Sequence, residues 1–215
     1  MDERMETFLE MYRKPVPDYI RELEKRALRE EVPVIRRGTR DVLRYLLCTR
    51  HPTEVLEVGT AIGYSSLFMK ECLPKTSRIS TVEKVEMRIR EAKKNLAEYD
   101  REGRICLLEG DAMEVLKMLV NDGKLFDFVF MDAAKGQYLN FLPYILELMN
   151  PGAILVSDNI FHEGDVLQSR FAVMRRDRTI HERMREYLSV LTNHERLETI
   201  CLPISDGMAL STFCP

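Results

Sequence analysis

The sequence predicts an α/β fold: a doubly wound, seven-stranded, mostly parallel sheet with a helical N-terminal preface and a C-terminal antiparallel hairpin. Three observations predict it. Short apolar runs alternate regularly with amphipathic helical patterns from residue 54 onward, with short connections. Right-handed crossovers then place helices on both faces of a parallel sheet. Finally, the last two strand-like segments have only a four-residue link between them, which is typical of a hairpin.

The first fifty residues predict a helical N-terminal extension, residues 1–50. Helix-type spacing over residues 3–30 is broken at Lys14–Pro17, and Val32–Val34 predicts an extended break around a proline. Gly38 and Thr39 then begin another helical pattern. This extension has three possible roles, which are shielding one side of the sheet, covering a ligand, or pairing two chains.

The core, residues 54–215, supplies the sheet. Its first five strands are predicted at Glu54–Val58, Arg78–Val82, Ile105–Leu108, Phe126–Met131 and Ala153–Ser157. Helices are predicted at Tyr64–Leu73, Val85–Tyr99, Ala112–Val120, Gln137–Met149 and Arg175–Leu191. The hairpin is predicted from Glu198–Pro203 and Met208–Phe213, linked by Ile204–Gly207.

Length and composition bound the class of protein. At 215 residues the chain is most simply one domain, residues 1–215, and its 45% hydrophobic and 31% charged residues are typical of a soluble globular protein. A net charge of −3 argues against a general nucleic-acid coat but leaves a local basic patch open. A charged N-terminus, the lack of a membrane-length apolar run, and five scattered cysteines without a C-x-x-C pair predict a cytoplasmic protein away from membranes.

A glycine turn and two acids predict a ligand at the strand ends. Gly59 and Gly63 form a G-x-x-x-G turn that lets the backbone approach a ligand. This turn is neither the three-glycine dinucleotide fingerprint nor a P-loop, which argues against hydride transfer and nucleotide hydrolysis. Glu83 ends the second strand, where an acid commonly accepts hydrogen bonds from ribose hydroxyls. Asp111 follows the third strand and either caps a helix or faces an adenine. Together they predict a nucleoside cofactor without a triphosphate.

Asp132 and Lys135 follow the most apolar strand. Ligands bind outside the carboxyl ends of strands in open α/β sheets, so both residues stand where chemistry is expected. The alternative is that Asp132 caps the next helix and Lys135 lies in solvent. Asp158 and Asn159 end the next strand and also suit a plain turn. If Asp132, Asp158 and Asn159 meet, three hard oxygen ligands suit Mg²⁺.

These motifs in combination resemble the cation-dependent class I O-methyltransferases related to catechol and caffeoyl-CoA methyltransferases. The sequence is most similar to their bacterial branch, the tRNA 5-hydroxyuridine methyltransferases. The resemblance covers nearly the whole chain and is carried by Leu56–Ser66, Glu83, Gly110–Ala112, Asp132–Tyr138, Asp158-Asn159 and Pro203–Ser211.

The resemblance implies a Rossmann-like core, a homodimer, S-adenosylmethionine (SAM) and a divalent cation such as Mg²⁺. The cation is implied on Asp132, Asp158 and Asn159. Ile35 departs from relatives that have methionine there. The implied SAM contacts are Ile35, Gly59, Ser65, Glu83, Asp111, Ala112 and Asp132.

The catalytic hypothesis assigns Lys135 and Asp132 to methyl transfer. A bound cation lowers the pKa of a ligated hydroxyl, and Lys135 beside it is a candidate to accept the proton. Catechols and 5-hydroxyuridine both present two vicinal oxygens, so this chemistry does not choose between them.

The arginines favour tRNA as the methyl acceptor, because they could hold RNA phosphates. The reaction would then convert 5-hydroxyuridine to 5-methoxyuridine at the wobble position. A solvated helix face explains some of these arginines equally well. One alternative is a small-molecule O-methyltransferase acting on catechol-like or caffeoyl-CoA-like hydroxyls. Another is a non-catalytic module that binds SAM or RNA. The arginines lie in two groups, Arg36, Arg37, Arg40 and Arg44, and Arg170, Arg175, Arg176, Arg178, Arg183 and Arg185.

Overall fold

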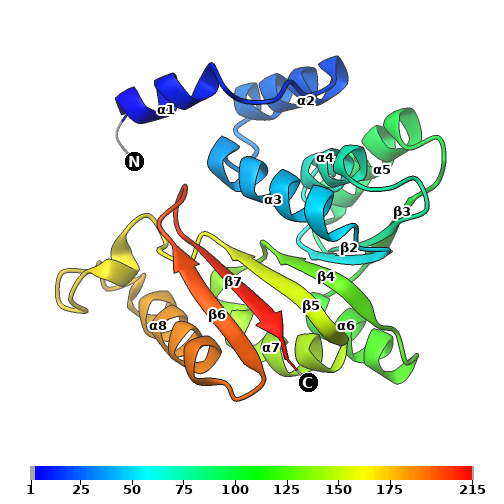
Figure 1. Cartoon of the computed structure of the whole chain (residues 1–215). Helices are drawn as coiled ribbons and strands as arrows, with labels where there is room; N and C mark the ends of the chain where they lie inside the picture. Colours follow the sequence, from blue (N-terminus) through cyan, green and yellow to red (C-terminus); the bar gives the residue numbers. More distant parts are fainter. Residues whose placement is uncertain (1–2, 215) are drawn as a thin grey trace.

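Seven strands form one sheet in the order β3-β2-β1-β4-β5-β7-β6 (Figure 1). The computed structural model describes residues 3–214. Strands β1 to β5 are parallel, and β7 runs antiparallel to both of its neighbours, β5 and β6. The predicted fold class is therefore confirmed. The strands are β1 (Glu54–Val58), β2 (Arg78–Glu83), β3 (Ile105–Glu109), β4 (Phe126–Met131), β5 (Met149–Asp158), β6 (Leu197–Leu202) and β7 (Met208–Phe213).

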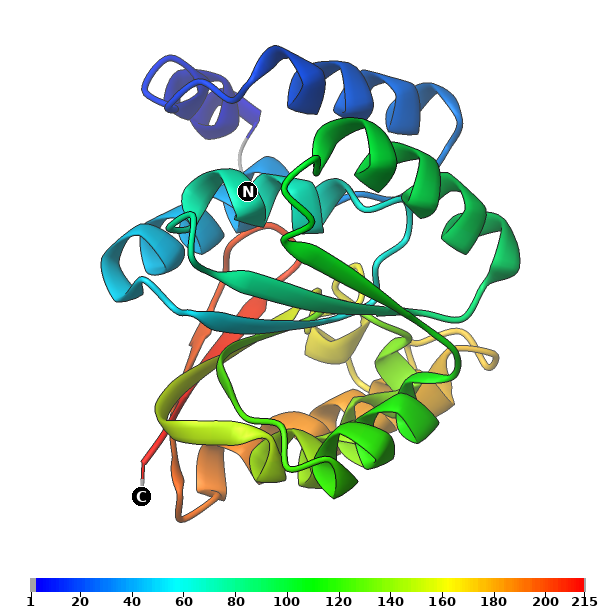
Figure 2. The ribbon, with the colours of Figure 1, turned by 90° about the vertical axis from the view of Figure 1, so that its right-hand side faces the viewer.

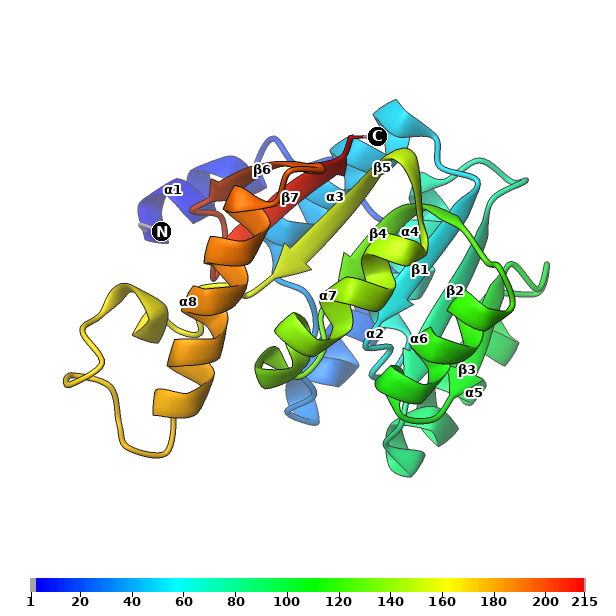
Figure 3. The same ribbon diagram turned by 90° about the horizontal axis from the view of Figure 1, so that it is seen from below.

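Helices cover both faces of the sheet (Figure 2). On one face lie α3, α4 and α5, with α2 packed against α4 as an outer layer, and on the other α6, α7 and α8 lie side by side (Figure 3). The helical elements are α1 (Glu3–Glu10), α2 (Asp18–Arg29), α3 (Arg37–Arg50), α4 (Tyr64–Cys72), α5 (Glu86–Tyr99), α6 (Ala112–Asn121), α7 (Tyr138–Glu147), α8 (Arg178–Asn193) and two 3-10 turns, η1 (Lys135–Gln137) and η2 (Asp165–Leu167).

The apolar runs of the inner strands explain this layering. Because successive strand residues point to opposite faces, Val55 and Leu56 of β1 enter different hydrophobic clusters, and both are fully buried. Phe128 and Val129 of β4 divide in the same way. An alternating apolar and polar pattern would have left one face in solvent. A continuous apolar run requires helices on both faces.

The chain changes direction across the sheet between β1 and β4. After β1 the crossovers through α4 and α5 lead outward to β2 and β3, whereas those through α6 and α7 lead to β4 and β5 on the other side. The Asp132 N–H donates to the Val58 carbonyl over 3.0 Å, which joins the carboxyl ends of the two central strands. Such a switch point is where open α/β sheets bind ligands.

The N-terminal extension shields the sheet. Ile20 and Leu23 of α2 and Leu43 and Leu47 of α3 are buried in the same cluster as Phe128. It also approaches the ligand edge of the sheet, as described below, whereas its pairing of two chains stays a prediction. Among the described helices, none is both long and apolar enough to span a membrane.

Two predicted boundaries were wrong by three or more residues, and several others differ by one or two. Strand β5 begins at Met149 and not at Ala153, because Met149 pairs with Phe126 before a register shift. Asn150, Pro151 and Gly152 lie within this irregular stretch, although their residue types are typical of a turn. Helix α8 begins at Arg178 and not at Arg175.

Candidate active site

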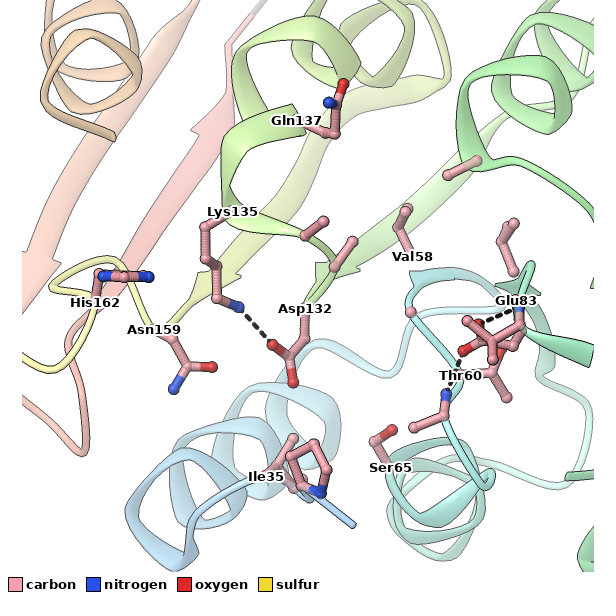
Figure 4. Close-up of a pocket in the computed structure, with 18 of the residues that line it drawn as sticks. Ile35, Val58, Thr60, Ser65, Glu83, Asp132, Lys135, Gln137, Asn159 and His162 are labelled. Carbon is pink, nitrogen blue, oxygen red and sulfur yellow. Dashed lines mark hydrogen bonds and ion pairs between the residues drawn. The ribbon is translucent and has the colours of Figure 1, made fainter. Parts of the chain in front are cut away.

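A cavity of about 1000 Å³ opens at the carboxyl edge of the sheet, at the switch point (Figure 4). Every residue predicted to contact the cofactor lines it, namely Ile35, Gly59, Ser65, Glu83, Asp111, Ala112 and Asp132. Lys135 and Asn159 line the same cavity, whereas Asp158 is fully buried behind the wall. The structure therefore brings the predicted site residues to one place from segments up to 124 positions apart, Ile35 to Asn159.

The glycine turn brings β1 against the backbone of Asp132. Gly59 has φ +110°, and a Cβ at this position would lie 2.2 Å from the Asp132 carbonyl oxygen. The N–H groups of Gly59 and Thr60 both point to the Val82 carbonyl, at 3.1 Å. A side chain at residue 59 would push apart the ends of β1 and β4, so the switch point requires glycine.

Glu83 orders the turn that faces the cavity. Its Oε2 accepts from the Ala61 N–H over 2.8 Å, and its Oε1 accepts from the N–H groups of Lys84 and Val85 over 2.9 Å each. An ionised carboxylate accepts about four hydrogen bonds, so capacity remains for a ligand hydroxyl. Figure 4 shows Glu83 beside the turn residue Thr60.

Asp111 caps helix α6, as one of the two sequence interpretations expected. Its Oδ1 accepts from the Met113 N–H over 3.0 Å, and its Oδ2 lies 3.3 Å from Lys84 Nζ. The cap orients the carboxylate at the cavity wall next to Ala112.

Lys135 is held inside the site and does not lie in solvent. Its Nζ donates to Asp132 Oδ1 over 2.7 Å and to the Tyr138 hydroxyl over 2.9 Å. The Lys135 side chain is 16% exposed. In Figure 4 its ammonium group points from η1 toward the Asp132 carboxylate at the end of β4.

Asp158 carries an unsatisfied buried oxygen. Its Oδ1 accepts from Thr39 Oγ1 over 3.1 Å and from the Asn159 N–H over 2.9 Å. Its Oδ2 is buried and has no hydrogen-bond partner within residues 3–214. Burial, and then the negative charge of Asp132, raise the pKa of Asp158 to about 6.

Asn159 turns its amide toward Asp132. Its backbone has φ +54°, a left-handed conformation that asparagine tolerates better than most residues. In Figure 4 the Asn159 side chain and the Asp132 carboxylate point into the same space, with His162 on the far side of Asn159.

Sequence reasoning missed three residues that support this site. Tyr138 bonds Lys135, Thr39 bonds Asp158, and the fully buried Glu57 accepts from Thr81 Oγ1 over 2.5 Å and from the Ser66 hydroxyl. Burial is the first cause that raises the pKa of Glu57 to about 7, with a smaller contribution from Asp132. The signal available for Glu57 was an acid inside an apolar strand, but no pattern named its partners.

The late arginines mostly form bonds within their own region. Arg176 lines the cavity mouth and lies 3.2 Å from the Asp177 carboxylate. Arg183 donates to the Gly136 carbonyl over 2.7 Å, which ties α8 to the turn that carries Lys135. Arg170 pairs with Glu182, Arg178 donates to the Val173 carbonyl and Arg185 donates to the Gln168 carbonyl.

The strand order and the polar cavity at the switch point define a Rossmann-like methyltransferase fold. A sequence model of the O-methyltransferase family matches residues 12–213, so the chain belongs to that family. The fold is shared with the SAH-bound methyltransferase of Podospora anserina, with a TM-score of 0.87 and 24% identity over 99% of this chain and 95% of that one.

Two relatives are named for phenolic acceptors. The catechol O-methyltransferase of Niastella koreensis is 35% identical over 114 residues, which span 53% of this chain and about half, 52%, of that protein. Caffeoyl-CoA O-methyltransferase 1 of Eucalyptus globulus is 30% identical over 174 residues, 78% of this chain and 70% of that protein. Both names refer to small-molecule acceptors, and neither refers to tRNA.

Proposed function

We propose that the protein transfers the methyl group of SAM to one of two vicinal oxygens on a small phenolic substrate, with a divalent cation bound beside Lys135. The observation that carries this proposal is the cluster of Asp132, Lys135 and Asp158 at the cavity that also contains the predicted cofactor residues. The alternative of a module that only binds a ligand gives no role to a lysine held at this edge.

The cavity wall divides into two parts. Gly59, Ser65, Glu83, Asp111 and Ala112 surround the part nearer β1, β2 and β3, where SAM is proposed to bind. SAM supplies an electrophilic methyl group, and SAH with a neutral sulfur remains after transfer. Lys135 and Asn159 lie at the ends of β4 and β5, where the acceptor is proposed to bind.

The donor set fits a divalent cation. Two carboxylates and an amide offer hard oxygen ligands, and the unpartnered buried Oδ2 of Asp158 is an oxygen that a cation would satisfy. In the part of the chain that the structure describes, no three His, Cys, Asp or Glu side chains gather as a metal site, so the Asn159 amide is needed. When bound, the cation would acidify and orient an acceptor hydroxyl.

Lys135 is proposed to take the proton from the hydroxyl group that accepts the methyl. In its neutral form, Nζ takes the proton as the acceptor oxygen bonds to the methyl carbon and the carbon–sulfur bond breaks. Asp132 then pairs with the resulting ammonium group over the 2.7 Å contact.

The test is turnover with matched acceptors. The purified protein with SAM and Mg²⁺ is incubated separately with catechol, with phenol, and with tRNA that contains 5-hydroxyuridine, and products are identified by mass spectrometry. Methylated catechol without methylated phenol or tRNA is expected, because only catechol is both small and bidentate. Methylation of the tRNA alone would replace the small-molecule proposal with the tRNA one.

A matched lysine pair controls for charge loss. Lys135→Ala is expected to lower kcat by about 100-fold or more, within the range for loss of a general base. Lys117→Ala, which breaks a similar three-residue contact with Glu114 at 2.9 Å on the exposed face of α6, is expected to leave kcat unchanged. Equal activity in both variants would remove Lys135 from the mechanism.

A further inference from the structure

The Tyr138 hydroxyl joins the three segments that form the acceptor end of the cavity. Its side chain is fully buried, and its oxygen lies 2.9 Å from the Met131 carbonyl of β4 and 3.1 Å from the Asp158 carbonyl of β5. The same oxygen lies 2.9 Å from Lys135 Nζ. A phenol has only one hydrogen to donate, and a carbonyl only accepts. The hydrogen therefore goes to a carbonyl, and the Tyr138 oxygen is the acceptor in its bond with Lys135.

Two bonds hold Lys135 Nζ at the cavity. The nitrogen donates to Asp132 Oδ1 and to the Tyr138 oxygen. The Tyr138 hydroxyl is itself tied to carbonyls of β4 and β5. Because Lys135 also lines the cavity, these bonds keep its nitrogen at the edge where the acceptor is proposed to bind.

We infer that Tyr138 is a positioning residue that holds Lys135 Nζ at the acceptor end of the cavity. This inference rests on the proposed role of Lys135 as the proton acceptor. The three segments converge on one buried hydroxyl, so its loss frees the amine to rotate about its side chain. The loss also leaves a buried carbonyl without its donor.

Tyr187 provides a matched control. It is also fully buried, packs edge-on against Tyr138 with ring centroids 5.4 Å apart, and pairs its hydroxyl with Ser157 Oγ over 2.6 Å. Tyr187→Phe and Tyr138→Phe therefore each remove one buried hydroxyl from the same aromatic pair. Only the second change removes a bond to Lys135.

Steady-state kinetics on catechol separate positioning from folding. Tyr138→Phe is expected to lower kcat by about 10–100-fold, the range for a hydrogen bond to a charged group, and to change KM for SAM little. Tyr187→Phe is expected to retain wild-type kcat. Equal losses in the two variants would show a packing effect and overturn the inference.

A double-mutant cycle tests whether Tyr138 acts through Lys135. In a Lys135→Ala background, adding Tyr138→Phe is expected to lower kcat no further, because the group it orients is gone. If the two losses multiply, Tyr138 acts independently of Lys135 and the inference is wrong.

Chemical labelling tests the inference without any substrate. Acetylation of Lys135 by a small amine reagent at fixed pH, followed by mass spectrometry, is expected to speed up severalfold in Tyr138→Phe and to stay unchanged in Tyr187→Phe. If the wild-type protein methylates no acceptor, the proposed function fails and labelling alone decides. Unchanged labelling in Tyr138→Phe overturns the inference even where catechol is methylated.

Discussion

One carboxylate oxygen of Asp158 distinguishes the proposed cation site from an ordinary strand end. A buried polar atom without a partner costs free energy, and proteins keep few of them. Thr39 and the Asn159 N–H both use Oδ1, which leaves Oδ2 free beside the cavity wall. The unpartnered Oδ2 therefore supports the proposed cation site, and Thr39 holds the other oxygen of the same carboxylate.

Removing the Asp158 carboxylate is therefore expected to abolish cation binding and leave SAM binding intact. Asp158→Ala should weaken Mn²⁺ binding, followed by electron paramagnetic resonance, by at least about 100-fold, because it removes a direct ligand and not only an outer partner. SAM affinity measured by calorimetry should change little, since Asp158 does not line the cavity. Asp177→Ala, an acid that lines the mouth, serves as the control. Retained Mn²⁺ affinity in Asp158→Ala would contradict the proposed donor set.

Because Glu57 is buried, the stability of the protein is expected to decrease as pH rises through the pKa of this carboxyl. Its pKa rises from 4.5 in the unfolded chain to about 7 in the folded protein, first because of burial. Between these pH values the folded state binds more protons than the unfolded state. The free energy of unfolding therefore falls as pH rises from about 4.5 to 7.

Glu57→Gln should remove this slope. In urea unfolding without added metal, the wild-type protein is expected to lose on the order of 3 kcal/mol from this group between pH 4.5 and 7, and the variant is expected to lose less. Glu54→Gln changes an exposed acid on the same strand and should keep the wild-type slope. If the slope of Glu57→Gln equals that of the wild type, Glu57 does not titrate in this range.

At the scale of elements, the turn after β1 shows why a glycine is required. Gly59→Ala adds left-handed strain and a contact with the Asp132 carbonyl, and together these should cost about 3 kcal/mol or more. Gly123 also has positive φ, +63°, but nothing lies within 4 Å of an added Cβ, so Gly123→Ala should cost only about 1–2 kcal/mol. Chemical denaturation measures both. Equal losses would show that the close approach does not matter.

The elements that the sequence predicted best are those whose structure is determined by their own residues and not by contacts with distant segments. Strands β1 and β4 were predicted at their observed bounds, because a continuous apolar run can only be buried on both faces. The start of β5 was missed, because Asn150–Gly152 resembles a turn and only pairing with β4 makes it strand. Here the pairing with β4 overrides the turn propensity of these three residues.

The candidate site divides in the same way. The ends of parallel strands must meet at one edge, so the gathering of Glu83, Asp132 and Lys135 followed from their positions. The bond of Thr39 to Asp158 joins residues 119 positions apart, and no local pattern reports it. The direction of the Tyr138 hydroxyl likewise depends on three segments that only the folded chain brings together.

For the whole molecule, the N-terminal extension is both part of the core and part of the site. Ile20, Leu23 and Ala27 of α2 are buried against the sheet cluster, and Ile35 lines the cavity. In contrast, Phe8, Met11 and Tyr12 at the chain start are 55%, 72% and 68% exposed. The extension therefore contains a segment that the fold requires and a segment on its surface.

Two truncations should separate these segments. Removal of residues 1–13 is expected to leave a folded protein whose melting temperature falls by only a few degrees, because it removes exposed side chains and breaks exposed ion pairs such as Glu10–Arg37 that contribute little. Removal of residues 1–30 strips α2 and its buried side chains from α4 and the cluster beneath it, where each large apolar side chain contributes about 1.5–3 kcal/mol, and cooperative unfolding should be lost. Circular dichroism on heating measures both, with SAM affinity as a second readout. A well-folded protein without residues 1–30 would mean that α3, α4 and α5 cover this face without α2, and that α2 is an accessory to the fold.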